Sequence, residues 1–465
     1  MDLIAAIATG SAATAIGIVR VSGDGCFSLC GRLFSAADKR ALSDHAPRTL
    51  IYGDILCADG ALLDRGLAAL FPAPHSYTGE DSVEFDCHGS PVALRELLSA
   101  LFSLGVRQAK PGEFTKRAFL NGRMDLTEAE AVIDLIDAET PAAAKNAAAQ
   151  LTGALRRKLS PVQDALLNVT SRFYAVVDYP DEDIEDVHPA DIAAALDTSE
   201  RTLSALLATS QRGKILKSGV RTAIVGRPNA GKSSLLNALA GFERAIVTDI
   251  PGTTRDTVEE SAFCGGVHLR LIDTAGLRET ADTVEALGVE RAKAALQSAD
   301  LVLAVIDGAE AALHGLSEED RSVLEQVSRC PKWLLIFSKA DLAGGADICP
   351  QVRFSGTDAV APAAILSLSS VTGAGLDALE QSVCALFPVS QQDAGALLTD
   401  TRQEDAVRRA LSAIRRAKDA MAGGLTPDAI LTDAEEALDA LGELTGRTAR
   451  EDLVARIFSR FCVGK

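Results

Sequence analysis

The chain has 465 residues, of which 47% are apolar and 24% are charged, and its formal net charge is −18. This balance is typical of a globular protein, and the length is enough for about two to four domains. The acidity excludes a protein that holds nucleic acid through its overall field, so any RNA contact must use a local basic patch or a partner protein.

The cysteines and the amino-terminal sequence indicate in which cellular compartment the protein is expected. The 9 cysteines include no CxxC pair and share no ligand spacing with the 6 histidines, so a structural zinc site is not expected. Their odd number indicates a reducing, cytoplasmic setting. A signal peptide is rejected because Asp2 replaces its positive charge and Gly10 breaks the apolar run. No apolar run is long enough for a membrane span.

The first part of the chain predicts a small α/β domain at residues 1–118, with strands at 16–21 and 67–71 and a helix at 91–104. Apolar residues then recur at helical spacing over 125–177 and again over 190–216. Asp125 followed by Glu128 is typical of a capping box. We assign residues 119–217 to the first part of a helical domain. The acidic run at 181–186 is interpreted as a solvated loop rather than a metal site.

Residues 218–387 show a different pattern, because apolar strands alternate there with helical segments. The alternation predicts a mostly parallel, doubly wound sheet. Helical character returns at residue 401, so 388–465 is assigned to the second part of the helical domain, into which the α/β domain is inserted. The expected strands of the sheet are 222–225, 269–272, 301–306, 334–337 and 364–368.

The segment Gly226-Arg-Pro-Asn-Ala-Gly231-Lys232-Ser233 has the complete pattern of a phosphate loop. It follows a strand and precedes a helical pattern, which is the context that the motif needs. The backbone N–H groups and the helix amino end can bind phosphates. Lys232 is expected to reach the β- and γ-phosphates of a nucleotide, and Ser233 to ligate Mg²⁺.

Three further motifs follow strands in the order found in GTPases. They are Asp273-Thr274-Ala275-Gly276, Ser338-Lys339-Ala340-Asp341 and Ser369-Ser370. Asp341 can accept hydrogen bonds from the ring N–H and the amino group of guanine, a donor pair that adenine lacks, so we expect GTP rather than ATP. Ser338 stands where GTPases usually carry Asn, and this departure weakens one expected contact that tethers the loops.

The residue after Gly276 is Leu277, whose apolar side chain cannot orient an attacking water. Another group must do so, and an arginine, Arg255 or Arg278, can also stabilise the transition state. A monovalent cation is a further possibility, because Asn229 offers a side-chain carbonyl. The carboxylates that can act on water lie just downstream and are Glu279, Asp282 and Glu285.

Together these stretches resemble the MnmE (TrmE) family of tRNA-modification GTPases, within the TrmE-Era-EngA-YihA-Septin-like superfamily. The resemblance spans essentially the whole chain, and the terminal Cys-x-Gly-Lys is its most specific feature. Besides the phosphate loop, the stretches that carry it are Thr248-Asp249-Ile250-Pro251-Gly252-Thr253-Thr254-Arg-Asp256, Asp273-Thr-Ala-Gly-Leu-Arg278, Tyr77-Thr-Gly-Glu-Asp81, Pro111-Gly-Glu-Phe114 and Phe461-Cys-Val-Gly-Lys465.

The resemblance implies an N-terminal α/β domain with a tetrahydrofolate-binding-like fold that also mediates homodimerisation. It also implies a central helical domain with an inserted Ras-like P-loop G domain. It implies a partner, an MnmG-type FAD protein, that forms a heterotetramer with the homodimer. Together they add a carboxymethylaminomethyl group, of the aminomethyl type, at C5 of the wobble uridine (position 34) of certain tRNAs. The implied cofactors are GTP, Mg²⁺, K⁺ and 5-formyltetrahydrofolate or another one-carbon tetrahydrofolate, and K⁺ promotes hydrolysis through dimerisation of the G domains.

The resemblance also implies roles for single residues. Glu285 matches the residue that orients the attacking water, and Ser233 and Thr254 match the Mg²⁺ positions. Cys462 is the family's C-terminal cysteine, and residue type alone leaves open whether its thiol reacts or packs. The K⁺ positions are Asn229, Thr248, Ile250 and Thr253, and the folate positions are Arg20, Glu84, Arg123 and Lys465. The GTP contacts are Asn229, Ala230, Gly231, Lys232, Ser233, Ser234, Thr248, Asp249, Ile250, Pro251, Gly252, Thr253, Thr254, Asp273, Thr274, Ala275, Gly276, Ser338, Lys339, Asp341, Ser369 and Ser370.

Two alternatives stay open at this point. The first is a GTPase switch that binds ribosomal RNA during ribosome assembly, although that class usually carries a basic RNA-binding domain. The second makes the N-terminal domain a dimerisation scaffold without a ligand.

Overall fold

The computed structural model describes residues 2–10, 12–179, 181, 187–242, 260–272, 296, 298–343, 360–388, 397–448 and 450–464. The chain divides into two compact units. The first comprises Met1–Asp137, Ala147–Ala205 and Asp405–Lys465, and the second comprises Ala138–Asn146 and Leu206–Glu404.

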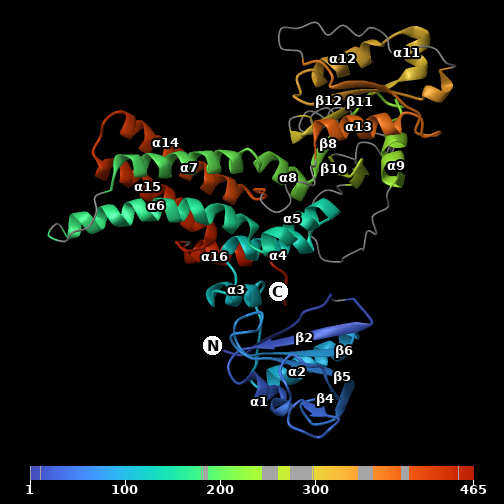
Figure 1. Ribbon diagram of the computed structural model, residues 1–465. Helices are drawn as coiled ribbons and strands as arrows, with labels where there is room; N and C mark the ends of the chain where they lie inside the picture. Colours follow the sequence, from blue (N-terminus) through green and yellow to red (C-terminus); the bar gives the residue numbers. More distant parts are fainter. Residues whose placement is uncertain are drawn as a thin grey trace. The chain divides into compact units, whose positions relative to one another are not determined.

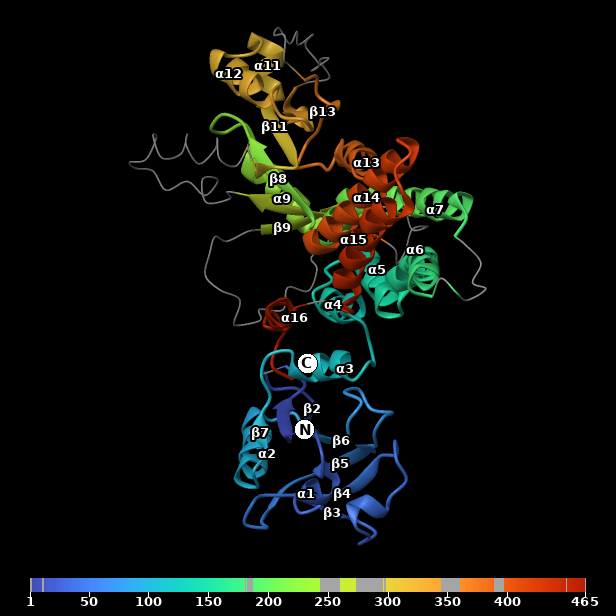
Figure 2. The same cartoon turned by 90° about the vertical axis from the view of Figure 1, so that its left-hand side faces the viewer.

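The amino-terminal part of the first unit is built on a seven-stranded sheet with the order β3-β4-β5-β6-β2-β1-β7. Neighbouring strands are antiparallel except β1 and β7. Helix α2 (Pro91–Ser103) lies against this sheet and buries a leucine-rich face on it (Figure 2). The strands are β1 (Ile4–Ile7), β2 (Ile16–Ser22), β3 (Phe34–Ala36), β4 (Ile51–Leu56), β5 (Leu62–Phe71), β6 (Ser82–His88) and β7 (Arg107–Gln108). Two short helices, α1 (Cys26–Cys30) and α3 (Glu113–Leu120), belong to the same part.

The rest of the first unit is helical, and its helices come from both sides of the α/β domain in the sequence. Helix α15 (Pro427–Thr445) packs against α6 (Ala154–Asp178) and α4 (Leu126–Ile136) (Figure 1). Helix α14 (Thr401–Ala422) pairs with α7 (Pro189–Leu207) through Arg415 and Lys418, which both contact Glu200. The packing of segments so distant in sequence confirms that the α/β domain is an insertion. Helix α16 (Glu451–Phe458) also belongs to the first unit, whereas α5 (Pro141–Leu151) begins in the second unit and ends in the first.

The second unit contains a six-stranded sheet with the order β13-β12-β11-β8-β10-β9, parallel except for the β9–β10 pair. Strands β11 and β12 are buried along their whole length, as expected when helices cover both faces of a parallel sheet. The strands are β8 (Val220–Val225), β9 (Glu260–Cys264), β10 (Val267–Ile272), β11 (Leu301–Asp307), β12 (Trp333–Ser338) and β13 (Ala364–Ser367). The helices are α8 (Ser210–Ser218), α9 (Lys232–Phe242), α11 (Gly308–His314), α12 (Glu318–Val327) and α13 (Leu376–Leu386).

The fold class expected from the sequence is confirmed, and so are the five predicted strands of the second unit. The capping box at Asp125 and Glu128 is present. The two long helical tracts are broken, however, since 125–177 forms α4, α5 and α6, and 190–216 forms α7 and α8. Gly153, with φ of 81°, begins α6 and separates it from α5. The sequence pattern does not predict six of the strands, β1, β3, β4, β6, β7 and β9.

Two further expectations concern membranes and metals. None of the described helices combines the length and apolarity that crossing a bilayer requires. Within the described ranges, no three histidine, cysteine or acidic side chains gather as a metal site would require. The acidic run at 181–186 lies almost entirely outside the described residues.

Candidate functional site

The phosphate loop lies where the sequence predicts it, between β8 and α9. Gly226 has φ of 158° and Gly231 has φ of 93°. A Cβ on Gly226 would stand 2.2 Å from the carbonyl oxygen of Val305, so only glycine fits beneath this turn. Lys232 folds back over the loop, and its Nζ donates to the carbonyl oxygens of Gly226 at 2.9 Å and of Arg227 at 2.7 Å. The backbone therefore forms a tight cradle with an ammonium group above it.

The start of α9 supplies the predicted Mg²⁺ ligand. Ser233 and Ser234 are exposed in the first turn of this helix, directly after Lys232. Hydroxyl oxygens at a helix amino end beside a lysine suit a nucleotide phosphate and its hard cation. Asn229 is exposed within the loop and has a left-handed φ of 62°, which is uncommon for a residue other than glycine.

Ser338 links the end of β12 to the phosphate loop. It is the last residue of β12 and is buried, and its Oγ lies 2.5 Å from the carbonyl oxygen of Ala230 and 3.1 Å from that of Ile306. A hydroxyl can donate one hydrogen bond at a time, and the shorter contact reaches the phosphate loop. Ser338 therefore still links β12 to the phosphate loop. From the sequence we expected this contact to be weaker, because GTPases usually carry Asn at this position.

The Ser338→Ala change removes this tether and leaves the buried Ala230 carbonyl without its side-chain donor. We expect GDP and GTP to bind about two- to tenfold more weakly, the equivalent of one net hydrogen bond. Dissociation of a fluorescent guanine nucleotide measures the effect. Ser382→Ala is the matched control, because the Ser382 hydroxyl only bonds to its own helix at an exposed position. Equal dissociation rates in Ser338→Ala and the unmodified protein would contradict the tether.

Lys339 and Asp341, which are predicted to lie near the base, follow Ser338 at the carboxyl end of β12. Lys339 has φ of 57°, and its Nζ lies 2.7 Å from Oδ2 of Asp307, which also caps α11. Burial raises the pKa of Asp307, but the hydrogen bonds from Lys339 and the Glu310 amide, together with the charges of Lys339 and Arg227, outweigh burial and leave that pKa below its usual range. Asp341 is exposed, next to Lys339. Its carboxylate is therefore open to a guanine base.

The loop after β13 carries Ser369 and Ser370, the two serines expected to contact the base. Ser369 is fully buried, and its Oγ accepts hydrogen bonds from the amides of Val371 and Thr372. It therefore shapes the loop rather than presenting its side chain to a ligand. Ser370 is half-buried at the loop surface.

Arg227 holds the phosphate loop in place, although the phosphate-loop motif does not specify this residue. Arg227 forms ion pairs with Glu310 on α11 and, at 3.3 Å, with Asp320 on α12. Its position is variable in the phosphate-loop pattern, so sequence reasoning missed it. The carboxylates on the two helices therefore hold the outer side of the loop.

The first unit contains a second site around Arg20. Arg20 on β2 lies directly opposite Glu84 on β6, and its Nε donates to Oε1 of Glu84 at 2.7 Å. The guanidinium carbon lies 5.2 Å from the ring centroid of Tyr77 and 5.7 Å from that of Phe114. Among the hydrogen bonds of the described residues, Arg20 uses only Nε. Its terminal amino groups can therefore bind an anionic or carbonyl oxygen.

Arg123 reaches the same neighbourhood through the turn that carries Tyr77. Gly79, with φ of 81°, approaches Asn121 and Arg123 so closely that a Cβ there would stand 3.2 Å from Cγ of Arg123. Asn121 donates to the carbonyl oxygen of Thr78 at 2.7 Å. The turn at residues 77–79 therefore links the surroundings of Arg20 and Arg123. Burial raises the pKa of Tyr77, so its hydroxyl stays protonated.

The carboxyl terminus packs on the amino-terminal domain. The amide of Gly112 donates to the carbonyl oxygen of Cys462 at 3.3 Å. Gly464 has φ of 102°, and a Cβ there would stand 2.2 Å from the carbonyl oxygen of Ile7. Cys462 itself is exposed. The terminal motif is thus placed beside β1, the neighbour of the strand that carries Arg20.

Several predicted site residues lie outside the described residues. They are Thr248, Asp249, Ile250, Pro251, Gly252, Thr253, Thr254, Asp273, Thr274, Ala275, Gly276, Glu285 and Lys465. Asp273 directly follows the last residue of β10, Ile272.

The phosphate loop, the base-side carboxylate and the parallel sheet that joins them define a P-loop GTPase. Two family models match the chain, "GTP-binding protein TrmE N-terminus" over residues 3–123 and "MnmE helical domain" over residues 126–462. A relative named tRNA modification GTPase MnmE, from Laribacter hongkongensis, is 42% identical and aligns with 100% of this chain and 99% of its own length. The chain therefore belongs to the MnmE family of tRNA modification GTPases.

A second full-length relative agrees with this assignment. The tRNA modification GTPase MnmE of Heliobacterium modesticaldum is 42% identical over 472 residues, covering 100% of this chain and 99% of that protein. A crystal structure of Era with MgGDPNP and a fragment of 16S ribosomal RNA is 26% identical over 42% of this chain and 66% of that chain, with a TM-score of 0.28. A score this low supports no argument, and family membership is established by the full-length relatives.

Proposed function

We propose that this protein hydrolyses GTP to drive the addition of a carboxymethylaminomethyl-type group at C5 of the wobble uridine of tRNA, together with an MnmG-type flavoprotein. The observation that carries the proposal is the presence in one chain of two separate sites. One is the guanine-nucleotide site at the carboxyl edge of the second unit's sheet, with Lys232 and Asp341. The other is the Arg20 site on the first unit's sheet.

In the nucleotide site, the phosphate cradle and Lys232 would hold the β- and γ-phosphates, and Ser233 with Thr254 would hold Mg²⁺. The bound cation would offset the charge that develops as the γ-phosphoryl group leaves GDP and bonds to water. Glu285 would orient that water. Asp341 would select guanine, while Ser338 holds the phosphate loop against the base-binding strand.

Potassium is proposed as an activating ion, with Asn229 as one ligand beside Thr248, Ile250 and Thr253. The exposed position of Asn229 in the loop supports this, because its side-chain oxygen can face a cation beside the phosphates. GTP hydrolysis is therefore expected to be faster in K⁺ than in Na⁺ at equal ionic strength, and Asn229→Ala is expected to abolish the difference. Phosphate release in the two salts measures this, and equal rates in the unmodified protein would refute the assignment.

The Arg20 site is proposed to bind 5-formyltetrahydrofolate or a related one-carbon folate, with Glu84, Arg123 and Lys465. A guanidinium beside two aromatic rings suits a flat ligand with anionic groups. Arg20→Ala is expected to weaken folate binding about 10- to 100-fold, because a hydrogen bond to a charged group is lost. Isothermal titration measures this.

The matched control for this change is Arg65→Ala, since Arg65 forms a similar cross-strand pair with Asp54 in the same sheet but is 63% exposed. Folate affinity should stay unchanged in the control. Equal affinity in Arg20→Ala would favour a ligand-free dimerisation scaffold.

The partners follow from the same proposal. Two copies of this chain would pair through their amino-terminal domains, and the flavoprotein would complete a heterotetramer. Size-exclusion chromatography with light scattering, with and without the flavoprotein, tests this assembly.

Nucleoside analysis of tRNA tests the proposed function directly. Deleting the gene should remove the modified wobble uridine, and expression of the intact chain should restore it. If the modified nucleoside persists in the deletion strain while ribosomal subunits accumulate incompletely assembled, a ribosome-assembly GTPase that binds ribosomal RNA takes the place of this proposal.

A further inference from the structure

Two cavities adjoin at the amino ends of the strands in the second unit. Their volumes are about 470 Å³ and about 610 Å³, and they share Gln211, Ile215, Lys332 and Phe387. We call their union the basic groove. It borders the starts of β8, β10, β11 and β12, whereas the nucleotide site lies at the carboxyl ends of those strands. The groove is therefore a separate place on the same sheet.

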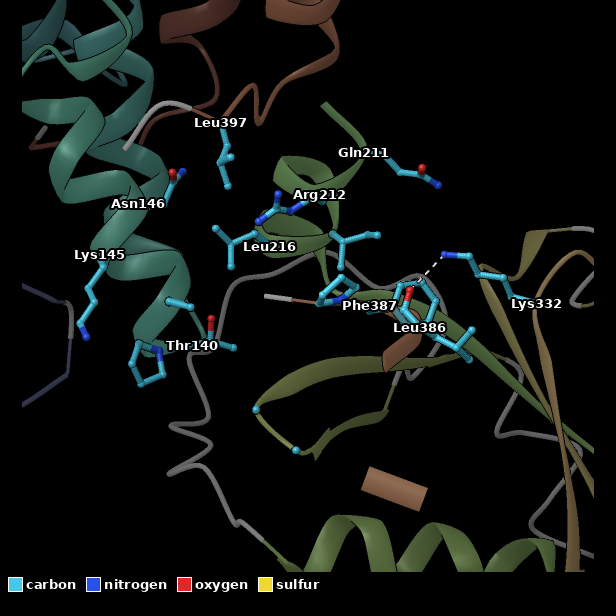
Figure 3. A pocket seen from close by; sticks show the side chains of 16 residues that line it. Thr140, Lys145, Asn146, Gln211, Arg212, Leu216, Lys332, Leu386, Phe387 and Leu397 are labelled. Atoms are coloured by element: carbon cyan, nitrogen blue, oxygen red, sulfur yellow. Dashed lines mark hydrogen bonds between the residues drawn. The ribbon is translucent and has the colours of Figure 1, made fainter. Parts of the chain in front are cut away.

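The charge of the groove is opposite to that of the chain. The smaller cavity is lined by three basic side chains and no acidic one: Lys145 from α5, Arg212 from α8 and Lys332 before β12 (Figure 3). The larger cavity adds four more basic residues, Lys214, Lys217, Arg221 and Arg270, against two carboxylates, Asp300 and Asp400. The whole chain carries 46 basic and 64 acidic residues. Positive charge is thus concentrated here.

Structural ion pairs account for part of this charge. Arg221 pairs with Asp300 at 3.1 Å and Lys217 with Asp400 at 3.5 Å, and Lys214 pairs with Glu404. Lys332, in contrast, donates to the carbonyl oxygen of Leu386 at 3.2 Å and lies 4.3 Å from the ring of Phe387, and neither group carries a formal charge. Lys332 therefore adds positive charge to the groove that these ion pairs do not offset.

We propose that the basic groove binds the sugar–phosphate backbone of the tRNA substrate, an inference that rests on the proposed function. A chain with net charge −18 needs a local basic surface to hold RNA, and the groove supplies one. A run of phosphates matches cations spread along two joined cavities better than a single small anion does. The basic groove is thus the RNA-contacting surface of the second unit.

The test uses the full-length chain with both Lys145→Gln and Arg212→Gln, and an unmodified tRNA transcript. We expect tRNA affinity to fall roughly three- to tenfold at low salt, and the slope of log K against log salt to shrink by about one per removed cation. Arg65→Gln with Arg329→Gln is the control, since these arginines are 63% and 74% exposed outside the groove. GTP hydrolysis without tRNA should be unchanged in every variant.

Each outcome decides the proposal. Unchanged affinity and salt slope in the groove variant overturn it, and so does selective loss of flavoprotein binding, which makes the groove a protein surface. If the modified wobble uridine still depends on the protein, only the groove assignment fails and the proposed function stands. If the intact protein binds no tRNA and the wobble uridine is modified without it, both the groove assignment and the proposed function fail. Lys145 is exposed, so Lys145→Gln alone serves if the double variant does not fold.

Discussion

Replacing Glu285 by alanine is expected to slow GTP hydrolysis by about 10²- to 10⁴-fold, the range for loss of a positioned general base. GTP affinity should stay nearly unchanged, because the phosphate loop and Asp341 hold the nucleotide. The reason for the large effect is Leu277, whose apolar side chain leaves the usual water-orienting position without a polar group. Phosphate release at saturating GTP, with nucleotide binding measured separately, checks the result.

Glu279→Ala and Asp282→Ala are the controls for this prediction, since both carboxylates lie just upstream of Glu285 in the same stretch. Each should retain the turnover of the unmodified protein. If Glu285→Ala hydrolyses GTP at the normal rate while one of the other two is inactive, the role passes to that residue.

Replacing Arg117 by methionine is expected to cost the first unit about 3–5 kcal/mol of unfolding free energy. The Arg117 side chain is 5% exposed and lies 2.9 Å from Glu80, whose side chain is 9% exposed. It also donates to the Asp2 carbonyl oxygen at 2.8 Å and to Glu113 at 3.2 Å. Methionine would fill the space and leave the buried Glu80 carboxylate without its cationic partner, with the Ser22 hydroxyl still donating to it.

The pKa shift of Arg117 agrees with this expectation. Burial disfavours its charged form, but the hydrogen bonds and charges of Glu80 and Glu113 outweigh burial and hold its pKa above the usual range. Hydrogen exchange followed by peptide mass spectrometry should show faster exchange in β2 and β6.

Arg40→Met is the control for this change, because Arg40 and its partner Asp38 are both exposed. An exposed ion pair contributes little to stability, so exchange should be unchanged. Normal protection of β2 and β6 in Arg117→Met would show that the buried network is not needed.

Features of this protein that depend on consecutive residues were predictable from its sequence. The phosphate loop binds through the backbone of a single stretch, so its pattern specifies both its conformation and its ligand. Strands β11 and β12 are nearly continuous apolar runs because helices cover both faces of the sheet, and such runs are easy to recognise. The capping box at Asp125 is equally local, since its two hydrogen bonds join residues three apart.

Only the tertiary structure decided which distant residues meet. Arg20 and Glu84 are 64 positions apart and pair because β2 and β6 lie in register. Ser338 reaches Ala230 across 108 positions because two parallel strands end at one edge. Strand pairing and close packing create such contacts, and no spacing in a single sequence encodes them. The same reason explains why the basic groove could not be predicted, as its cations come from separate strand and helix ends that only the sheet brings together.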